Sequence, residues 1–146
     1  MRKNIRVRVK HLIKKYGTRN PLLIAKYLNI HVVYKEYSPC TKGYYIKILR
    51  NKFIIVNSTL DEYSQKIVLA HELGHAVLHS SEPVYFIREH TLFPIGPYEV
   101  EANKFAAELL IDDDDIQEML HESTEYIAAR LEVNEKLVKY KLQNRK

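Results

Sequence analysis

Apolar residues in the first third of the chain recur at helical spacing and then change to short extended runs. The helical spacing predicts helices near residues 3–16 and 21–28, the second opened by Asn20 and Pro21. Three runs rich in β-branched and aromatic side chains follow, near residues 31–36, 44–49 and 53–56. The last two runs are separated by the turn Arg50-Asn51-Lys52 and therefore predict a β-hairpin.

Helical spacing returns in the second half of the chain. A run over residues 67–78 is apolar nearly all round, which indicates a buried helix, and Thr59-Leu60-Asp61-Glu62 before it fits a capping box. A second helical stripe covers residues 97–111, and residues 81–96 between the two stripes are rich in proline and aromatic residues and predict a loop. Two or three short helices are expected after it, the first opened by the aspartates Asp112 to Asp115.

The order of these elements favours an α+β fold. Strands and helices come in blocks, so the chain lacks the regular alternation of a wound parallel sheet. We expect a small, antiparallel-containing sheet packed against the buried helix, with additional C-terminal helices over residues 112–146. A length of 146 residues with 46% hydrophobic residues predicts that residues 1–146 form one domain with a modest core.

Charge is divided unevenly along the chain. The first 35 residues contain ten Lys or Arg and no Asp or Glu, whereas residues 97–122 contain nine acids and one base. The basic N-terminal helix could contact nucleic acid or an acidic partner, although a solvated helix face, with or without docking to the chain's own acidic half, explains the same pattern. Residues 123–138 resemble half of a helix-turn-helix, but their second helix offers lysines and few residues able to read base edges. DNA binding is therefore the weaker alternative.

Hydropathy and cysteine content indicate in which cellular compartment the protein lies. No apolar run approaches the roughly 18 residues that a membrane-spanning helix requires, and the basic N-terminus is not followed by a signal-like apolar core. Cys40 is the single cysteine, so an internal disulfide cannot form. We therefore expect a cytoplasmic protein without a membrane partner.

One motif in the buried helix carries candidate chemistry. His71-Glu72-Leu73-Gly74-His75 has the form H-E-x-x-H, and histidines four residues apart lie on one helix face, where both rings can bind one cation. Glu72 would lie beside that cation and could take a proton from an activated water. This arrangement is typical of zinc-dependent hydrolases of amide bonds. The alternative is a hydrogen-bonded core cluster, since buried polar side chains need partners.

A catalytic zinc takes three protein ligands, so the motif requires a third from elsewhere. The metzincin pattern continues with a glycine and a third histidine shortly after the motif. Leu78 and Ser81 occupy those two positions in this chain. A metzincin is therefore excluded, and the third ligand must come from another element.

The helix predicted for residues 97–111 offers a candidate. Glu99 lies three residues before Ala102 on the apolar stripe, and Asn103 follows one turn after Glu99. Such a pair can supply a carboxylate to zinc and an amide that orients a ligating histidine. Glu101 points about 200° away from Glu99 around the helix, so only one of the two can face the site. We predict Glu99 as the ligand; the alternative is that both are ordinary surface glutamates.

These motifs together resemble the ImmA/IrrE-type metallopeptidases. The shared features are Tyr16-Gly17-Thr18-Arg19-Asn20-Pro21 before Ile24-Ala25, a short strand pair, H-E-L-G-H followed by Leu78-His79, and E-x-x-A-N-x-F-A-x-x-L-L. The resemblance covers most of the chain and implies a minimal gluzincin-like metallopeptidase fold. It implies Zn²⁺ bound by His71, His75 and Glu99, with Glu72 as the catalytic acid/base. His79 matches a trailing histidine that is frequent in the family, whereas Asp112 stands where many relatives have a proline.

The resemblance also implies a class of substrate, because several family members act as antirepressors on helix-turn-helix repressors of phages, mobile elements or stress regulons. The first hypothesis is a zinc metallo-endopeptidase that hydrolyses such a repressor. The second is a non-proteolytic antirepressor or transcriptional regulator that keeps the zinc fold and acts by binding a repressor or DNA. Only the first hypothesis requires Glu72 as a base. For that reaction, Tyr85, His90 and Tyr98 are candidates to polarise the scissile carbonyl.

Overall fold

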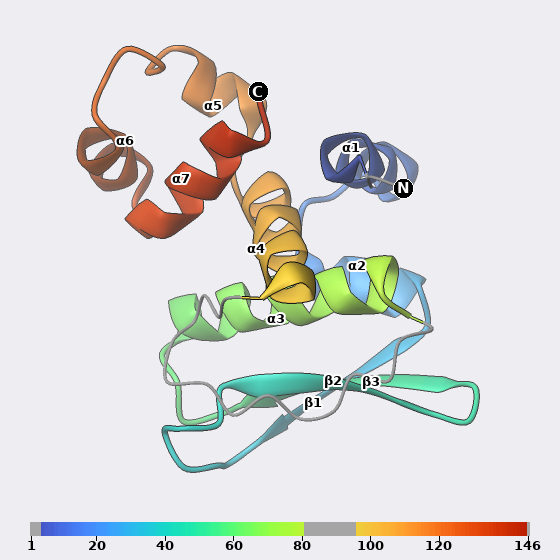
Figure 1. The fold of residues 1–146 in the computed structure, drawn as a ribbon. Helices are drawn as coiled ribbons and strands as arrows, with labels where there is room; N and C mark the ends of the chain where they lie inside the picture. The colour runs from blue at the N-terminus through green and yellow to red at the C-terminus, as the bar shows by residue number, and fades with distance from the viewer. Residues whose placement is uncertain (1–3, 81–95, 146) are drawn as a thin grey trace.

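A computed structural model describes residues 4–80 and 96–145 of the chain. Over these residues it contains a three-stranded sheet and seven helices, which confirms the predicted α+β fold. Figure 1 shows α2 and α3 against one face of the sheet, with α4 crossing α3 and separating the sheet layer from α1 and the C-terminal helices. Both ends of the chain lie on the side away from the sheet (Figure 1). No helix in these residues is long and apolar enough to cross a membrane.

The two predicted N-terminal helices are present as α1 (Ile5–Tyr16) and α2 (Pro21–Tyr27). Helix α1 ends at Gly17, whose φ of 68° lets its N–H donate to the Ile13 carbonyl at 2.8 Å. The Asn20 side chain accepts hydrogen bonds from the first turn of α2. These signals are local, which is why the sequence predicted both helices closely.

The sheet has the strand order β1-β3-β2 and mixed direction. Strand β1 (Ile30–Lys35) pairs in parallel with β3 (Asn51–Asn57), and β2 (Gly43–Ile48) pairs antiparallel with β3, which confirms the predicted hairpin. The predicted three-residue turn was wrong, because Ile48 pairs with Asn51 and leaves a two-residue connection. Its first residue, Leu49, is 89% exposed and has a φ of 57°.

The buried helix of the motif is α3 (Glu62–Leu78). Its N-cap is Asp61, which accepts a hydrogen bond from the Ser64 N–H at 3.3 Å. The predicted capping box beginning at Thr59 was therefore displaced by two residues. The physical reason is that the Thr59 hydroxyl and N–H both donate to the buried Asn57 side chain, at 2.8 and 2.9 Å, so Thr59 belongs to the preceding turn.

Helix α4 (Pro97–Leu110) crosses α3 at very close range. A Cβ atom added to Gly74 of α3 would lie 3.1 Å from the Phe105 Cβ and 3.2 Å from the Ala102 Cα. The absence of a side chain at Gly74 therefore allows the two helices to meet between the two histidines of the motif. Phe105 is completely buried at this crossing.

The C-terminal part forms α5 (Asp113–Gln117), α6 (Thr124–Leu131) and α7 (Glu135–Gln143). Asp112 caps α5, as expected for the acidic run. The second hydrophobic cluster joins these helices to α3 and α4; its larger members are Ile67, Ile111, Ile116, Ile127, Leu137 and Val138. The C-terminal helices therefore pack on the two helices that carry the motif residues.

A buried ion pair fastens α7 to α4 and α5. The Lys141 Nζ lies 2.7 Å from the Glu108 carboxylate and 2.5 Å from that of Asp113. Arg6 and Lys10 of α1 also approach Asp113, each at 3.2 Å. Burial would raise the pKa of Asp113, but hydrogen bonding and attraction from Lys141, with Lys10 and Arg6, lower it well below its usual range.

Candidate metal centre

The three polar residues of the motif face one point in the interior. His71, Glu72 and His75 are buried on α3, with ring centroids of the two histidines 4.9 Å apart and their planes 81° to each other. One potential ligand atom from each of the three residues lies within 4.8 Å of the others. The helical spacing predicted from the sequence therefore brings these side chains to one place.

Glu99, in the first turn of α4, reaches the same point from the facing helix. Its Oε2 lies 3.5 Å from the His71 Nε2, and its Oε1 is in close contact with the His75 Nε2. The Glu72 Oε1 is 3.9 Å from the same His71 nitrogen. The structure thus gathers all four residues predicted for the site, although their roles as ligands and base stay predictions.

Several atoms at this point lack the hydrogen bonds that burial demands. In the described part of the chain, the Nε2 atoms of His71 and His75 and both Glu99 carboxylate oxygens are buried and make no hydrogen bond. Unpaired buried donors and acceptors are costly, and native proteins rarely keep them. Two imidazole nitrogens and a carboxylate are the donor set of a His₂-carboxylate zinc site, so these residues fit a divalent cation.

The charge state of Glu99 agrees with that donor set. Burial alone would raise the pKa of this carboxyl, but the close approach of the His71 and His75 rings and their coulombic attraction lower it to about 2. Glu99 is therefore an anion at neutral pH. An anionic carboxylate is the form that binds a metal.

His71 is oriented by the second polar residue of the E-x-x-A-N stretch. Its Nδ1 lies 2.8 Å from the Asn103 Oδ1, and the Asn103 amide nitrogen donates to the Tyr140 hydroxyl at 3.3 Å. With its amide oxygen towards His71, Asn103 accepts the Nδ1–H and leaves a lone pair on the His71 Nε2. This arm of the site therefore extends to α7, a connection that the sequence did not reveal.

His75 has a different neighbour on its outer nitrogen. Its Nδ1 lies 3.0 Å from the Nδ1 of His79, and the His79 Nε2 lies 2.7 Å from the Glu101 Oε1. The expectation that only Glu99 reaches the two motif histidines agrees with the geometry, but Glu101 is not an ordinary surface glutamate. Sequence reasoning missed this contact, although the repeat of histidines at positions 71, 75 and 79 signals a third ring on the same helix face.

Three residues were candidates to polarise a substrate carbonyl. Tyr85 and His90 lie outside the described residues. The Tyr98 ring lies against that of His79, with centroids 4.6 Å apart. Tyr98 thus contacts the histidine cluster at its outer end.

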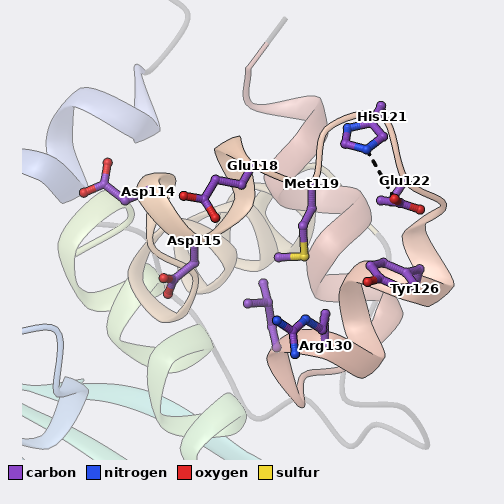
Figure 2. A pocket seen from close by; sticks show the side chains of 9 residues that line it. Asp114, Asp115, Glu118, Met119, His121, Glu122, Tyr126 and Arg130 are labelled. Atoms are coloured by element: carbon purple, nitrogen blue, oxygen red, sulfur yellow. Dashed lines mark ion pairs between the residues drawn. The ribbon is translucent and has the colours of Figure 1, made fainter.

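A separate hollow lies between α5 and α6 (Figure 2). Four of its nine lining residues are acidic, and one of them, Glu122, pairs with His121 at 3.2 Å. The remaining lining residues are Asp114, Asp115, Glu118, Met119, Tyr126, Arg130 and Leu131. None of these residues belongs to the His-Glu cluster, so the hollow is a different feature of the surface.

Comparison with known proteins identifies relatives of the whole arrangement. The family model Peptidase_M78, described as the IrrE N-terminal-like domain, matches residues 25–143, which include both motif helices and the C-terminal helices. The chain is 46% identical over 109 residues to "Uncharacterized immunity region protein 2" of Bacillus phage phi105, covering 75% of this chain and 69% of the relative. It is 28% identical over 145 residues to "Metallopeptidase ImmA" of Bacillus subtilis (strain 168), covering 96% and 85%. With the family model spanning most of its length, this chain belongs to the ImmA/IrrE-type metallopeptidases.

Proposed function

We propose that this chain is a zinc-dependent endopeptidase. The observation that carries the proposal is the convergence of two buried imidazole nitrogens and the Glu99 carboxylate, all without hydrogen bonds among the described residues. Zinc held by such residues supplies Lewis acidity, which lowers the pKa of water from 15.7 to about 7 and polarises a carbonyl group. The family of metallopeptidases to which the chain belongs supports the same reading.

The chain's own residues divide the work of hydrolysis. His71 and His75 would hold the cation through Nε2, and Glu99 through its carboxylate. Glu72, buried beside them, would accept a proton as water attacks the carbonyl carbon and would pass that proton to the amine nitrogen as the C–N bond breaks. Asn103 keeps the His71 Nε2 free of a proton and thus able to bind a metal.

For the substrate we propose a helix-turn-helix repressor or a similar regulator, which makes the protein an antirepressor. The name of the phage relative, an immunity region protein, and that of the relative ImmA support a role connected with repression. Such a substrate would require the enzyme to act in the cytoplasm. The competing proposal is a regulator that keeps the metal fold but acts by binding alone.

Metal content tests the centre. We expect elemental analysis of purified protein to find about one zinc per chain, with the metal lost in Glu99→Ala. Glu125→Ala, which removes an exposed carboxylate on α6, is the matched control and should keep the metal. Absence of zinc from the wild type after zinc is supplied, or its retention in Glu99→Ala, would contradict the proposed ligand set.

Glu72→Gln tests the reaction. This change keeps the size of the side chain and removes the base, so cleavage of purified helix-turn-helix repressors should fall by about 10²-fold or more while zinc content is unchanged. Intact-mass spectrometry of the repressors follows cleavage, and release of operator DNA by the repressor follows antirepression. If Glu72→Gln still relieves repression fully, the binding-only function is correct.

A further inference from the structure

Two successive side-chain contacts connect His75 with Glu101 of α4 through His79. His79, the C-cap residue of α3, follows His75 by one turn, and its Nδ1 lies 3.0 Å from the His75 Nδ1. The His79 Nε2 lies 2.7 Å from the Glu101 Oε1, with side-chain exposures of 0% for His79 and 29% for Glu101. The Tyr98 ring packs against the His79 ring with an angle of 44° between their planes, so the imidazole is held by a ring contact as well as at both nitrogens.

For a neutral His79, the chemistry of these groups assigns the protons. An ionised carboxylate only accepts hydrogen bonds, so the His79 Nε2 must carry the proton of the contact with Glu101. The Nδ1 of a neutral His79 is then an acceptor. Because the contact between the two Nδ1 atoms needs one donor, His75 must be the donor, and its lone pair is left on Nε2, which faces Glu99.

We propose that His79 and Glu101 are positioning residues that hold His75 in the Nδ1–H tautomer for metal binding. The inference rests on the proposed zinc function, which it deepens. Ligating histidines commonly donate their second N–H to a carboxylate or carbonyl, which fixes the ring and raises its basicity as a ligand. Here an imidazole is inserted between the ligand and the carboxylate, so Glu101 acts on His75 through His79.

The two histidine ligands are thereby oriented by different means. Asn103, a neutral amide on α4, accepts from His71, whereas a carboxylate acts on His75 through a second ring. The Glu99 and Glu101 side chains both come from the first turns of α4 and meet successive histidines of α3.

Zinc affinity measures the effect. Competition with a chromophoric chelator should give a zinc dissociation constant 10- to 100-fold weaker for Glu101→Ala than for the wild type. Glu101→Gln, which still offers an amide oxygen to the His79 N–H, should recover part of the loss. The matched control is Glu125→Ala, and far-UV circular dichroism establishes that each variant is folded.

The tautomer of His79 is a signature that a merely structural residue would not give. Long-range ¹⁵N–¹H correlation spectra of the full chain at pH 8 should show His79 protonated at Nε2 in the wild type, with or without zinc, and this preference should be lost in Glu101→Ala. A wild-type His79 protonated at Nδ1 would overturn the proposal, even if Glu101→Ala did not fold.

The affinity results separate the two levels of inference. Equal zinc affinity of wild type and Glu101→Ala would overturn the positioning role and leave the zinc site intact. A wild type that binds no zinc would refute the proposed function and, with it, any role of Glu101 toward the metal. A graded loss from wild type through Glu101→Gln to Glu101→Ala would support both.

Discussion

Replacing Lys141 with methionine should strongly destabilise the protein. The Lys141 ammonium is 1% exposed and contacts two carboxylates, Glu108 at 2.7 Å and Asp113 at 2.5 Å. Methionine fills a similar volume, so the change removes the cation with little loss of packing. Asp113 would keep Arg6 and Lys10, each at 3.2 Å. Buried Glu108 would keep the Asn144 amide at 2.9 Å as its described partner and would lose its counter-charge.

The size of the effect follows from that imbalance. Removing one partner of a buried ion pair costs about 3–5 kcal/mol of the free energy of unfolding, because the other charge stays buried. We expect about 3 kcal/mol, the lower end, since Asp113 retains two cations. Replacing the buried carboxylate as well, in Lys141→Met with Glu108→Leu, should restore the stability to within about 1 kcal/mol of the wild type, because Asp113 still has Arg6 and Lys10.

Urea unfolding followed by far-UV circular dichroism at pH 7 measures these differences. The pH dependence adds an independent test. Because folding lowers the pKa of Asp113, its contribution to stability is fully present above the unfolded value of 3.8 and is lost as the pH falls through the lower folded value. The variant should therefore lose less stability than the wild type on acidification below about pH 4. A loss below about 1 kcal/mol in Lys141→Met, or no recovery in the double variant, would refute the reasoning.

Three further changes test the fold. Gly74→Ala should lower the free energy of unfolding by about 1–3 kcal/mol, because the new methyl group would press on Phe105 and Ala102. On a helix face without such a neighbour, the same change raises stability. A rise in the urea midpoint would therefore contradict the close crossing of α3 and α4. Arg19→Met should cost about 2 kcal/mol in the same assay, since the Arg19 Nη1 donates to the carbonyls of Glu108, Leu109 and Ile111 at 3.0, 3.1 and 3.4 Å; unchanged stability would show that water replaces the guanidinium there. Leu49→Asn should raise the free energy of unfolding by up to about 1 kcal/mol, and with it the thermal midpoint, because asparagine tolerates positive φ better than leucine. The control Ile48→Asn, at a neighbouring exposed position without positive φ, should give no such gain.

Local patterns in the sequence predicted much of this molecule. Asn20 and Pro21 gave the start of α2, and the run of four aspartates gave that of α5. The hairpin followed from β-branched and aromatic composition. These features depend on residues close in sequence, so the sequence alone is enough to predict them.

Non-local features escaped the sequence. The parallel pairing of β1 with β3 joins strands that are not neighbours in the sequence, and period-two alternation does not encode a pairing partner. Arg19 reaches carbonyls that lie 89 to 92 residues away, and a carbonyl has no signature in the sequence. Lys141 did carry a signal, since it follows Leu137 by one helical turn on a buried face, where lysine is unusual.

The sequence likewise predicted the local parts of the candidate site and missed the non-local ones. The spacing within one helix predicted that His71 and His75 lie on the same face, and the apolar stripe of α4 predicted that Glu99 points towards them. The angle predicted between Glu99 and Glu101 agrees with the structure, in which Glu99 approaches His71 and His75 and Glu101 approaches His79. The second contact was missed: His79, the C-cap residue of α3, lies one turn after His75, and its Nε2 is 2.7 Å from the Glu101 Oε1.

Gly74 limits how the motif could be transplanted. A designer who copied only the two histidines and the glutamate of H-E-x-x-H onto another helix would transfer donors for a cation but no place for the helix that brings Glu99. The bare backbone at Gly74 forms a notch in which Phe105 and Ala102 of the facing helix are seated. A transplanted site would therefore need both helices, with side chains that pack closely at their crossing. In this chain the second x of H-E-x-x-H must be as small as glycine, just as the two histidine positions must carry a ligand.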